Sequence, residues 1–247
     1  MIEFKHLSKN YQKKKVLKDI SLSIQAGKRT AVLGPNGSGK TTLIKTLLGL
    51  VIPTNGEILY KGSTVSKKWS YRENISYLPQ ITNFPDNLMV KELLKMINDL
   101  RGGTAAYQQL IERFGVDNFL NERIRNLSGG MVQKVNLILT FGFDSDLYIL
   151  DEPSNGLDPT ALIKLKELIF DLSGKGKSFL FTTHILPLVE QLADEIIFLL
   201  EGEIIFQGSI STLKENHQTN FEQAIVQLLQ QSDKFRGGNP AQQQKIS

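Results

Sequence analysis

The sequence predicts an α/β fold with a mostly parallel core sheet, an antiparallel β subdomain and an inserted α-helical subdomain. Short apolar or β-branched runs at 29–33, 147–150 and 178–182 have the composition of strands that are buried on both faces, as in a parallel sheet. Polar and apolar residues alternate near the N-terminus, which predicts antiparallel strands. From about 86 to 145 the apolar spacing becomes helical, and this stretch interrupts the predicted sheet.

The chain is organised around residues 34–41, which read G-x-x-x-x-G-K-T between a predicted strand and a predicted helix. Glycines let backbone N–H groups approach a polyphosphate, and the unpaired N–H groups that open the following helix favour an anion. Lys40 would reach the β- and γ-phosphates, and the Thr41 hydroxyl could ligate Mg²⁺. This stretch therefore predicts a P-loop NTPase. Its expected nucleotide-binding residues are Gly34, Pro35, Asn36, Gly37, Ser38, Gly39, Lys40, Thr41 and Thr42.

The regions on either side of this loop predict the antiparallel subdomain. Residues 2–7 and 16–24 are expected to be strands joined through 10–12. After a turn at 53–56, residues 57–60 look like an edge strand.

The inserted segment predicts helices. Residues 90–97 carry one apolar stripe at helical spacing, and a second helix is expected from Thr104 to near Gly115. Later, Asp158 as N-cap and Pro159 at the first helical position predict a helix that reaches Leu172.

The C-terminal part predicts a hairpin of 195–200 with 203–207, followed by an amphipathic helix beyond Asn216. A polar, Gln-rich tail at 231–247 is expected to fray. We therefore divide the chain into a domain of residues 1–216 and a C-terminal helix and tail of 217–247.

Composition excludes several classes of protein. The 247 residues contain 29 Lys and Arg against 25 Asp and Glu, a net charge of +4 that is dispersed apart from Lys13–Lys15. That run is expected to be a solvated turn, and the charge is too small for a dedicated nucleic-acid binder. Cysteine is absent, which excludes disulfides and thiolate metal sites.

The N-terminal residues 1–6 alternate like a strand, so no signal peptide is expected. The longest apolar runs, such as 196–200, are far shorter than the roughly 18 residues that cross a bilayer. If a membrane is involved, another chain is expected to span it.

Two acids and a histidine follow predicted core strands. The strand 147–150 would deliver Asp151 and Glu152 to its C-terminal end, and His184 follows the strand 178–182. In P-loop enzymes the acid at such a strand end holds Mg²⁺, which suits Asp151. Glu152 could polarise the attacking water. The alternatives are an ordinary surface acid and a structural histidine.

Residues 127–134 read Leu-Ser-Gly-Gly-Met-Val-Gln-Lys, in which Ser128 is a natural N-cap for a helix. By itself this is only a capped helix. Together with the P-loop before it and the strand-end Asp-Glu after it, it makes residues 2–215 closely resemble the ATP-binding cassette (ABC) ATPase family.

The resemblance implies roles for further residues. Tyr11 matches the aromatic residue that stacks on adenine, although it could be a plain strand-end tyrosine. Gln80 matches the glutamine that senses the metal and the γ-phosphate, with an ordinary loop glutamine as the alternative. His184 matches the switch histidine that contacts the γ-phosphate, and 154–158 matches the segment that crosses the dimer interface. Residues that match the signature contact with the other subunit's γ-phosphate are Ser128, Gly129 and Gly130.

Two positions depart from the usual pattern of the family. Met131 stands where many members have glutamine, and Lys134 where arginine is frequent. Both lie past the Ser-Gly-Gly contact. They therefore bear on the subfamily of the chain and not on ATP binding.

The resemblance also implies ATP and Mg²⁺ as cofactors and a head-to-tail homodimer or heterodimer with two ATP molecules at its interface. It implies a separate transmembrane permease subunit, with this chain peripheral on the cytoplasmic face of the membrane. Plausible permease contacts, for which a core role is the alternative, are Phe84, Leu88, Met89 and Val90.

The chain looks most like ATPases of multidrug or ABC-2-type exporters. A narrower similarity is to the ATPase of copper-processing systems that serve nitrous-oxide reductase maturation. The alternative is a soluble ABC ATPase in iron–sulfur assembly, translation or repair, and a nucleotide-binding regulator without turnover is disfavoured by intact Glu152 and His184.

Overall fold

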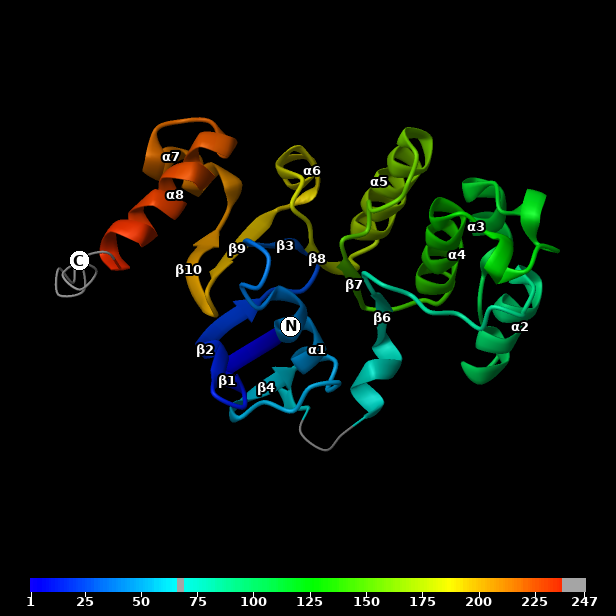
Figure 1. The fold of residues 1–247 in the computed structure, drawn as a ribbon, viewed down its shortest axis with the longest axis horizontal. Helices are drawn as coiled ribbons and strands as arrows, with labels where there is room; N and C mark the ends of the chain where they lie inside the picture. Colours follow the sequence, from blue (N-terminus) through cyan, green and yellow to red (C-terminus); the bar gives the residue numbers. More distant parts are fainter. Residues whose placement is uncertain (66–68, 237–247) are drawn as a thin grey trace, which may run out of the picture.

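The computed structural model describes residues 1–65 and 69–236, and it has two sheets with helices around them (Figure 1). The six-stranded sheet has the order β10-β9-β3-β8-β7-β6, in which all neighbours are parallel except the β9–β10 hairpin. Its strands are β3 (Arg29–Leu33), β6 (Ile75–Leu78), β7 (Leu147–Asp151), β8 (Ser178–Thr182), β9 (Glu195–Leu200) and β10 (Glu203–Gly208). Every residue of β7 and β8 is buried, which explains their unbroken apolar character. The predicted mostly parallel core sheet is confirmed.

The second sheet is antiparallel, in the order β2-β1-β4-β5, and lies below the main sheet in Figure 1. Its strands are β1 (Ile2–Tyr11), β2 (Lys14–Ile24), β4 (Asn55–Tyr60) and β5 (Ser63–Thr64). The first two strands extend beyond their predicted ends, because Tyr11 pairs with Lys14 and leaves only two residues for the turn. The prediction of a turn over Lys13–Lys15 is therefore wrong for Lys14 and Lys15, which belong to β2.

Three helices gather at one end of the molecule in Figure 1 and form the expected helical insertion. They are α2 (Val90–Leu100), α3 (Tyr107–Phe114) and α4 (Gly129–Phe141), with short 3₁₀ turns at Asp117–Phe119 and Ile124–Asn126. The start predicted at Thr104 is wrong. The N–H of Ala105 donates to the Asn98 side chain and that of Ala106 to the Gly142 carbonyl, so these residues are held by neighbouring segments instead.

The remaining helices lie around the main sheet, and the last two of them lie at the opposite end of the molecule from α2–α4 (Figure 1). They are α1 (Lys40–Leu47), α5 (Pro159–Gly174), α6 (Leu186–Leu192), α7 (Ile210–His217) and α8 (Phe221–Arg236), with a 3₁₀ turn at Ser70–Asn74 before β6. As predicted, the Asp158 carboxylate caps α5 by accepting from the N–H of Ala161. The last helix runs to Arg236, past the predicted start of the tail at 231. Residues 237–247 lie outside the described residues.

Alternation along the central strands places side chains in two hydrophobic cores. Ala31 and Leu33 of β3 pack on the side of α2–α6, whereas Val32 between them packs on the side of α1 and the antiparallel sheet. In the first core, the ring of Tyr148 stacks between those of Phe141 and Phe179, with centroids 5.1 and 5.3 Å away. Its hydroxyl donates to the Phe143 carbonyl, so this buried polar group is satisfied. Among the described helices, none is long and apolar enough to span a bilayer.

One part-buried ion pair joins the starts of two neighbouring strands. The Arg29 guanidinium and backbone N–H both donate to the Asp194 carboxylate. Burial alone would raise the pKa of Asp194, but the hydrogen bonds and positive charge of Arg29 outweigh it and hold the pKa below its usual range.

We expect Asp194→Asn to lower the free energy of unfolding at pH 7 by about 1–2 kcal/mol. Because the folded-state pKa is depressed, this contribution is complete above the unfolded-state pKa of about 3.9 and is lost as the pH falls below it. Urea denaturation at stepped pH values measures this difference. Glu57→Gln, which removes the exposed 4.0 Å pair with Lys5, is the control and should cost little. A difference between wild type and Asp194→Asn that did not shrink in acid would contradict the assignment.

Candidate functional site

The phosphate loop occupies a tight space at the ends of β3, β9 and β2. A Cβ on Gly34 (φ 148°) would lie 2.0 Å from the carbonyl oxygen of Leu199. A Cβ on Gly39 (φ 112°) would lie 2.9 Å from that of Val16. Side chains at either position would push the loop off the sheet, so both positions require glycine.

A cavity of about 430 Å³ opens over this loop. The loop supplies one wall, two acids at the end of β7 supply another, and the start of β2 supplies a third. Its lining residues are Lys14, Val16, Asn36, Gly37, Gly39, Lys40, Thr41, Thr42, Gln80, Asp151 and Glu152. The structure thus brings most of the sequence-predicted phosphate, metal and catalytic residues into one space.

Two features of the loop suit an anion. Helix α1 begins without a capping side chain, so its first N–H groups remain available to a ligand. The Ser38 hydroxyl is buried and has no hydrogen-bond partner among the described residues.

Lys40 Nζ donates to the carbonyls of Gly34 and Pro35 at 2.7 and 3.1 Å. Burial lowers the pKa of Lys40, although the charges of Glu152 and Asp151 act in the opposite direction.

The parallel sheet brings Asp151 beside the loop. One oxygen of this buried carboxylate accepts from the Thr182 hydroxyl, and the other from the Thr41 hydroxyl at 3.3 Å. Oxygen donors of this kind fit Mg²⁺, which takes few protein ligands and several from phosphate and water. Among the described residues there is no cluster of three His, Cys, Asp or Glu side chains that could hold a metal.

Glu152 has an unusual backbone. Its φ of 52° is left-handed, a conformation that costs energy outside glycine and that its surroundings must enforce. The Glu152 N–H donates to the Thr182 hydroxyl at 3.1 Å and to the Thr182 carbonyl at 3.2 Å. These hydrogen bonds hold the turn at the end of β7. The carboxylate is 9% exposed, and its Oε2 lies 3.1 Å from Nδ1 of His184, which is 70% exposed. His184 therefore contacts the acid but is not among the residues that line the cavity.

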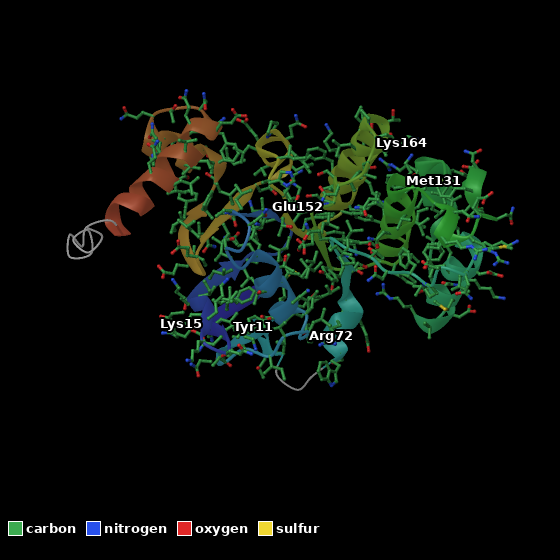
Figure 2. All side chains as sticks on the ribbon, viewed as in Figure 1. Tyr11, Lys15, Arg72, Met131, Glu152 and Lys164 are labelled. Atoms are coloured by element: carbon green, nitrogen blue, oxygen red, sulfur yellow. The ribbon has the colours of Figure 1, made fainter. Side chains whose placement is uncertain are left out.

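The signature residues lie apart from this chain's own phosphate cavity. As predicted, the Ser128 hydroxyl caps α4 by accepting from the N–H of Met131. Gly129 instead lines a second groove of about 360 Å³, which also includes Gln80, Asn155 and Gly156. Figure 2 shows Met131, at the start of α4, well separated from Glu152 in that view.

Contacts that the sequence did not reveal tie the signature to the segment after β7. A Cβ on Gly130 would lie 2.6 Å from the Gly156 carbonyl oxygen, so the two backbones touch. Lys134 Nζ lies 2.7 Å from the Asp158 carboxylate, whose pKa is lowered chiefly by this hydrogen bond. The sequence held a partial signal for this pair, namely a basic residue at 134 and an N-cap acid at 158.

Tyr11 is outside the lining of the phosphate cavity. Tyr11 ends β1, the residue is 46% exposed, and Lys9 Nζ lies 4.9 Å from its ring centroid. Its predicted contact with adenine remains a prediction. Sequence reasoning missed Lys14 and Val16 as lining residues, because the predicted strand began at 16 and the pairing of β2 with β1 is irregular there.

Comparisons with known proteins show to which family the chain is similar. The family model for the ABC transporter domain matches residues 17–155. The lantibiotic transport ATP-binding protein SrtF of Streptococcus pyogenes is 34% identical over 230 residues, which cover 92% of this chain and 98% of that protein. The ATP-binding protein NatA of Bacillus subtilis is 34% identical, covering 89% and 94%. The Nod factor export ATP-binding protein I of Burkholderia lata is 34% identical, covering 87% and 73%.

A solved structure of an ABC transporter ATP-binding subunit superposes with a TM-score of 0.86 at 29% identity, covering 93% of this chain and 99% of that one. The dimeric ATP-binding cassette MJ0796 bound to ADP and phosphate shares the fold, with a TM-score of 0.75 at 24% identity, covering 85% and 98%. The chain therefore belongs to the ABC transporter family, as an ATP-binding subunit.

Proposed function

We propose that this chain hydrolyses ATP with Mg²⁺ and that paired chains drive a separate transmembrane permease by closing on ATP. The observation that carries the proposal is the placement of Glu152, a nearly buried carboxylate that lines the cavity over an intact phosphate loop and contacts His184. In this reading Glu152 orients and polarises the attacking water.

Further roles follow from the same cavity. Thr41 and Asp151 would hold Mg²⁺ together with Gln80, and the metal would neutralise charge on the phosphates. Lys40 and the loop N–H groups would hold the β- and γ-phosphates. His184 would contact the γ-phosphate when the site closes, and Tyr11 would stack on adenine.

We propose that the active unit is a dimer in which the signature of one chain completes the site of the other. Ser128, Gly129 and Gly130 are not among the residues that line their own chain's phosphate cavity, which supports this arrangement. The N-terminus of α4 has two small residues, and its Ser128 cap satisfies only the N–H of Met131, so other N–H groups of the first turn can meet a partner's phosphate. The partner chain would be an identical or a homologous subunit.

We infer an exporter because relatives at 34% identity are named for lantibiotic transport and Nod factor export. Peripheral association with the cytoplasmic face of a membrane follows from that role. These names give no support to the copper-processing subgroup or to a soluble machine in iron–sulfur assembly, translation or repair. We assign ATPase function to residues 1–216, with 86–145 as the helical subdomain and 217–247 as a C-terminal helix and tail.

We expect Glu152→Gln to bind ATP with nearly wild-type affinity but to hydrolyse it about 10²–10⁴-fold more slowly, because the amide cannot polarise water. Bound ATP should then accumulate as a closed dimer. Phosphate release and size-exclusion chromatography with ATP measure the two effects. Glu122→Gln, at an exposed position with the same charge change, should behave like wild type. Undiminished phosphate release from Glu152→Gln would rule out this role.

The substitution Gly129→Asp tests formation of the dimer without disturbing the fold of the single chain. A Cβ at Gly129 meets nothing within 4 Å, so one chain should fold normally and bind ADP. In the dimer, the new carboxylate would face the partner's phosphate and repel it. We expect ATP-dependent dimerisation and hydrolysis to fall by at least about tenfold, as seen by light scattering and phosphate release. Gly174→Asp, also in open space, is the control. Normal dimerisation of Gly129→Asp would argue against the shared site.

A further inference from the structure

We propose that Lys14 supplies a second ammonium group to the phosphate chain of the bound nucleotide, an inference that rests on the proposed nucleotide-binding function. The class of ligand is a nucleoside di- or triphosphate, and Lys14 would act at the end of the phosphate chain nearest the base. None of the roles assigned above includes this residue.

The start of β2 lies directly against the phosphate loop. The Val16 carbonyl oxygen is 2.9 Å from the place where a Cβ of Gly39 would be. Lys14 and Val16 both line the cavity, and Val16 lies at an irregularity in the pairing of β2 with β1. Lys14 is therefore held beside the loop by the backbone packing that also requires glycine at 39.

Its two basic neighbours do not share this position. Lys13 is in the hairpin turn, and neither Lys13 nor Lys15 is among the residues that line the cavity. Figure 2 shows Lys15 at the outer edge of the antiparallel sheet in that view. Three consecutive lysines thus provide one that faces the cavity and two that do not.

The balance of charges in the cavity explains why a second ammonium group would help to bind a triphosphate there. Among the described residues, its lining includes the ammonium groups of Lys14 and Lys40 and the carboxylates of Asp151 and Glu152. A triphosphate brings several further negative charges, so with Lys40 alone the loaded site would stay negative even with one divalent ion. Lys14 is exposed, and its ammonium group has no hydrogen bond or ion pair to another described residue, so this group can turn to a phosphate while the backbone stays paired with β1.

Position along the strand indicates which part of the ligand Lys14 meets. It pairs across the hairpin with Tyr11, the expected adenine contact, while Lys40 belongs to the loop that would hold the β- and γ-phosphates. Lys14 thus adjoins the expected base contact through the hairpin and the phosphate loop through the cavity that it lines with Lys40. The α- and β-phosphates are therefore its expected partners.

The test compares Lys14→Gln with Lys15→Gln, which removes the same charge one residue away, and with Lys14→Arg, which keeps the charge. Isothermal titration calorimetry of the full chain with Mg-ADP and with adenosine, at low and physiological salt, gives the affinities. We expect Lys14→Gln to weaken ADP binding about five- to tenfold and to make it less dependent on salt. Lys15→Gln should change it less than about twofold, Lys14→Arg should restore most of it, and adenosine binding should not change.

Equal weakening by Lys14→Gln and Lys15→Gln would show a diffuse surface field and overturn the inference. Unchanged ADP binding by Lys14→Gln would overturn it as well. Either result leaves the proposed function intact as long as the wild-type chain binds and hydrolyses ATP. Failure of the wild-type chain to bind ADP or ATP would instead overturn both.

Discussion

The structure of the site depends on the close approach of backbone to backbone at the phosphate loop. Gly34 lies against the last residues of β9 and Gly39 against the start of β2, at separations that exclude any side chain. This contact fixes where α1 begins and therefore where its free N–H groups are directed. It also makes β2 a wall of the cavity, which is how an antiparallel strand far from the main sheet's centre contributes Lys14 and Val16.

The parallel sheet then assembles the remaining groups by aligning strand ends. β7 and β8 are neighbours, so the Thr182 hydroxyl reaches the Asp151 carboxylate and the Glu152 N–H together. This one threonine orients the expected metal ligand and stabilises the left-handed backbone of the expected catalytic acid. Strain at Glu152 is thereby offset by local hydrogen bonds, and its carboxylate is kept at the cavity with little freedom to turn away.

The signature residues at the start of α4 are held by a different set of contacts from those of the phosphate loop. Gly130 touches Gly156, Gln133 donates to the Pro153 carbonyl, and Lys134 pairs with Asp158. These contacts join the start of α4 to the segment that follows Glu152. Gln80 lines both the phosphate cavity and the neighbouring groove, which makes the β6–α2 connection a second link between them.

The sequence by itself determined the fold class, the phosphate loop, both helix caps at Ser128 and Asp158 and the strand-end acids, because each depends on local periodicity or on residue types with one conformational use. It misplaced the start of α3, where backbone groups bond to Asn98 and Gly142 from outside the segment, and it did not anticipate α7. Only the tertiary structure decided that His184 contacts Glu152, that Tyr11 stands outside the phosphate cavity and that Lys14 lines it. Those facts depend on which strands become neighbours and on which face of β2 meets the loop, and both are set by packing between segments that are distant in the sequence.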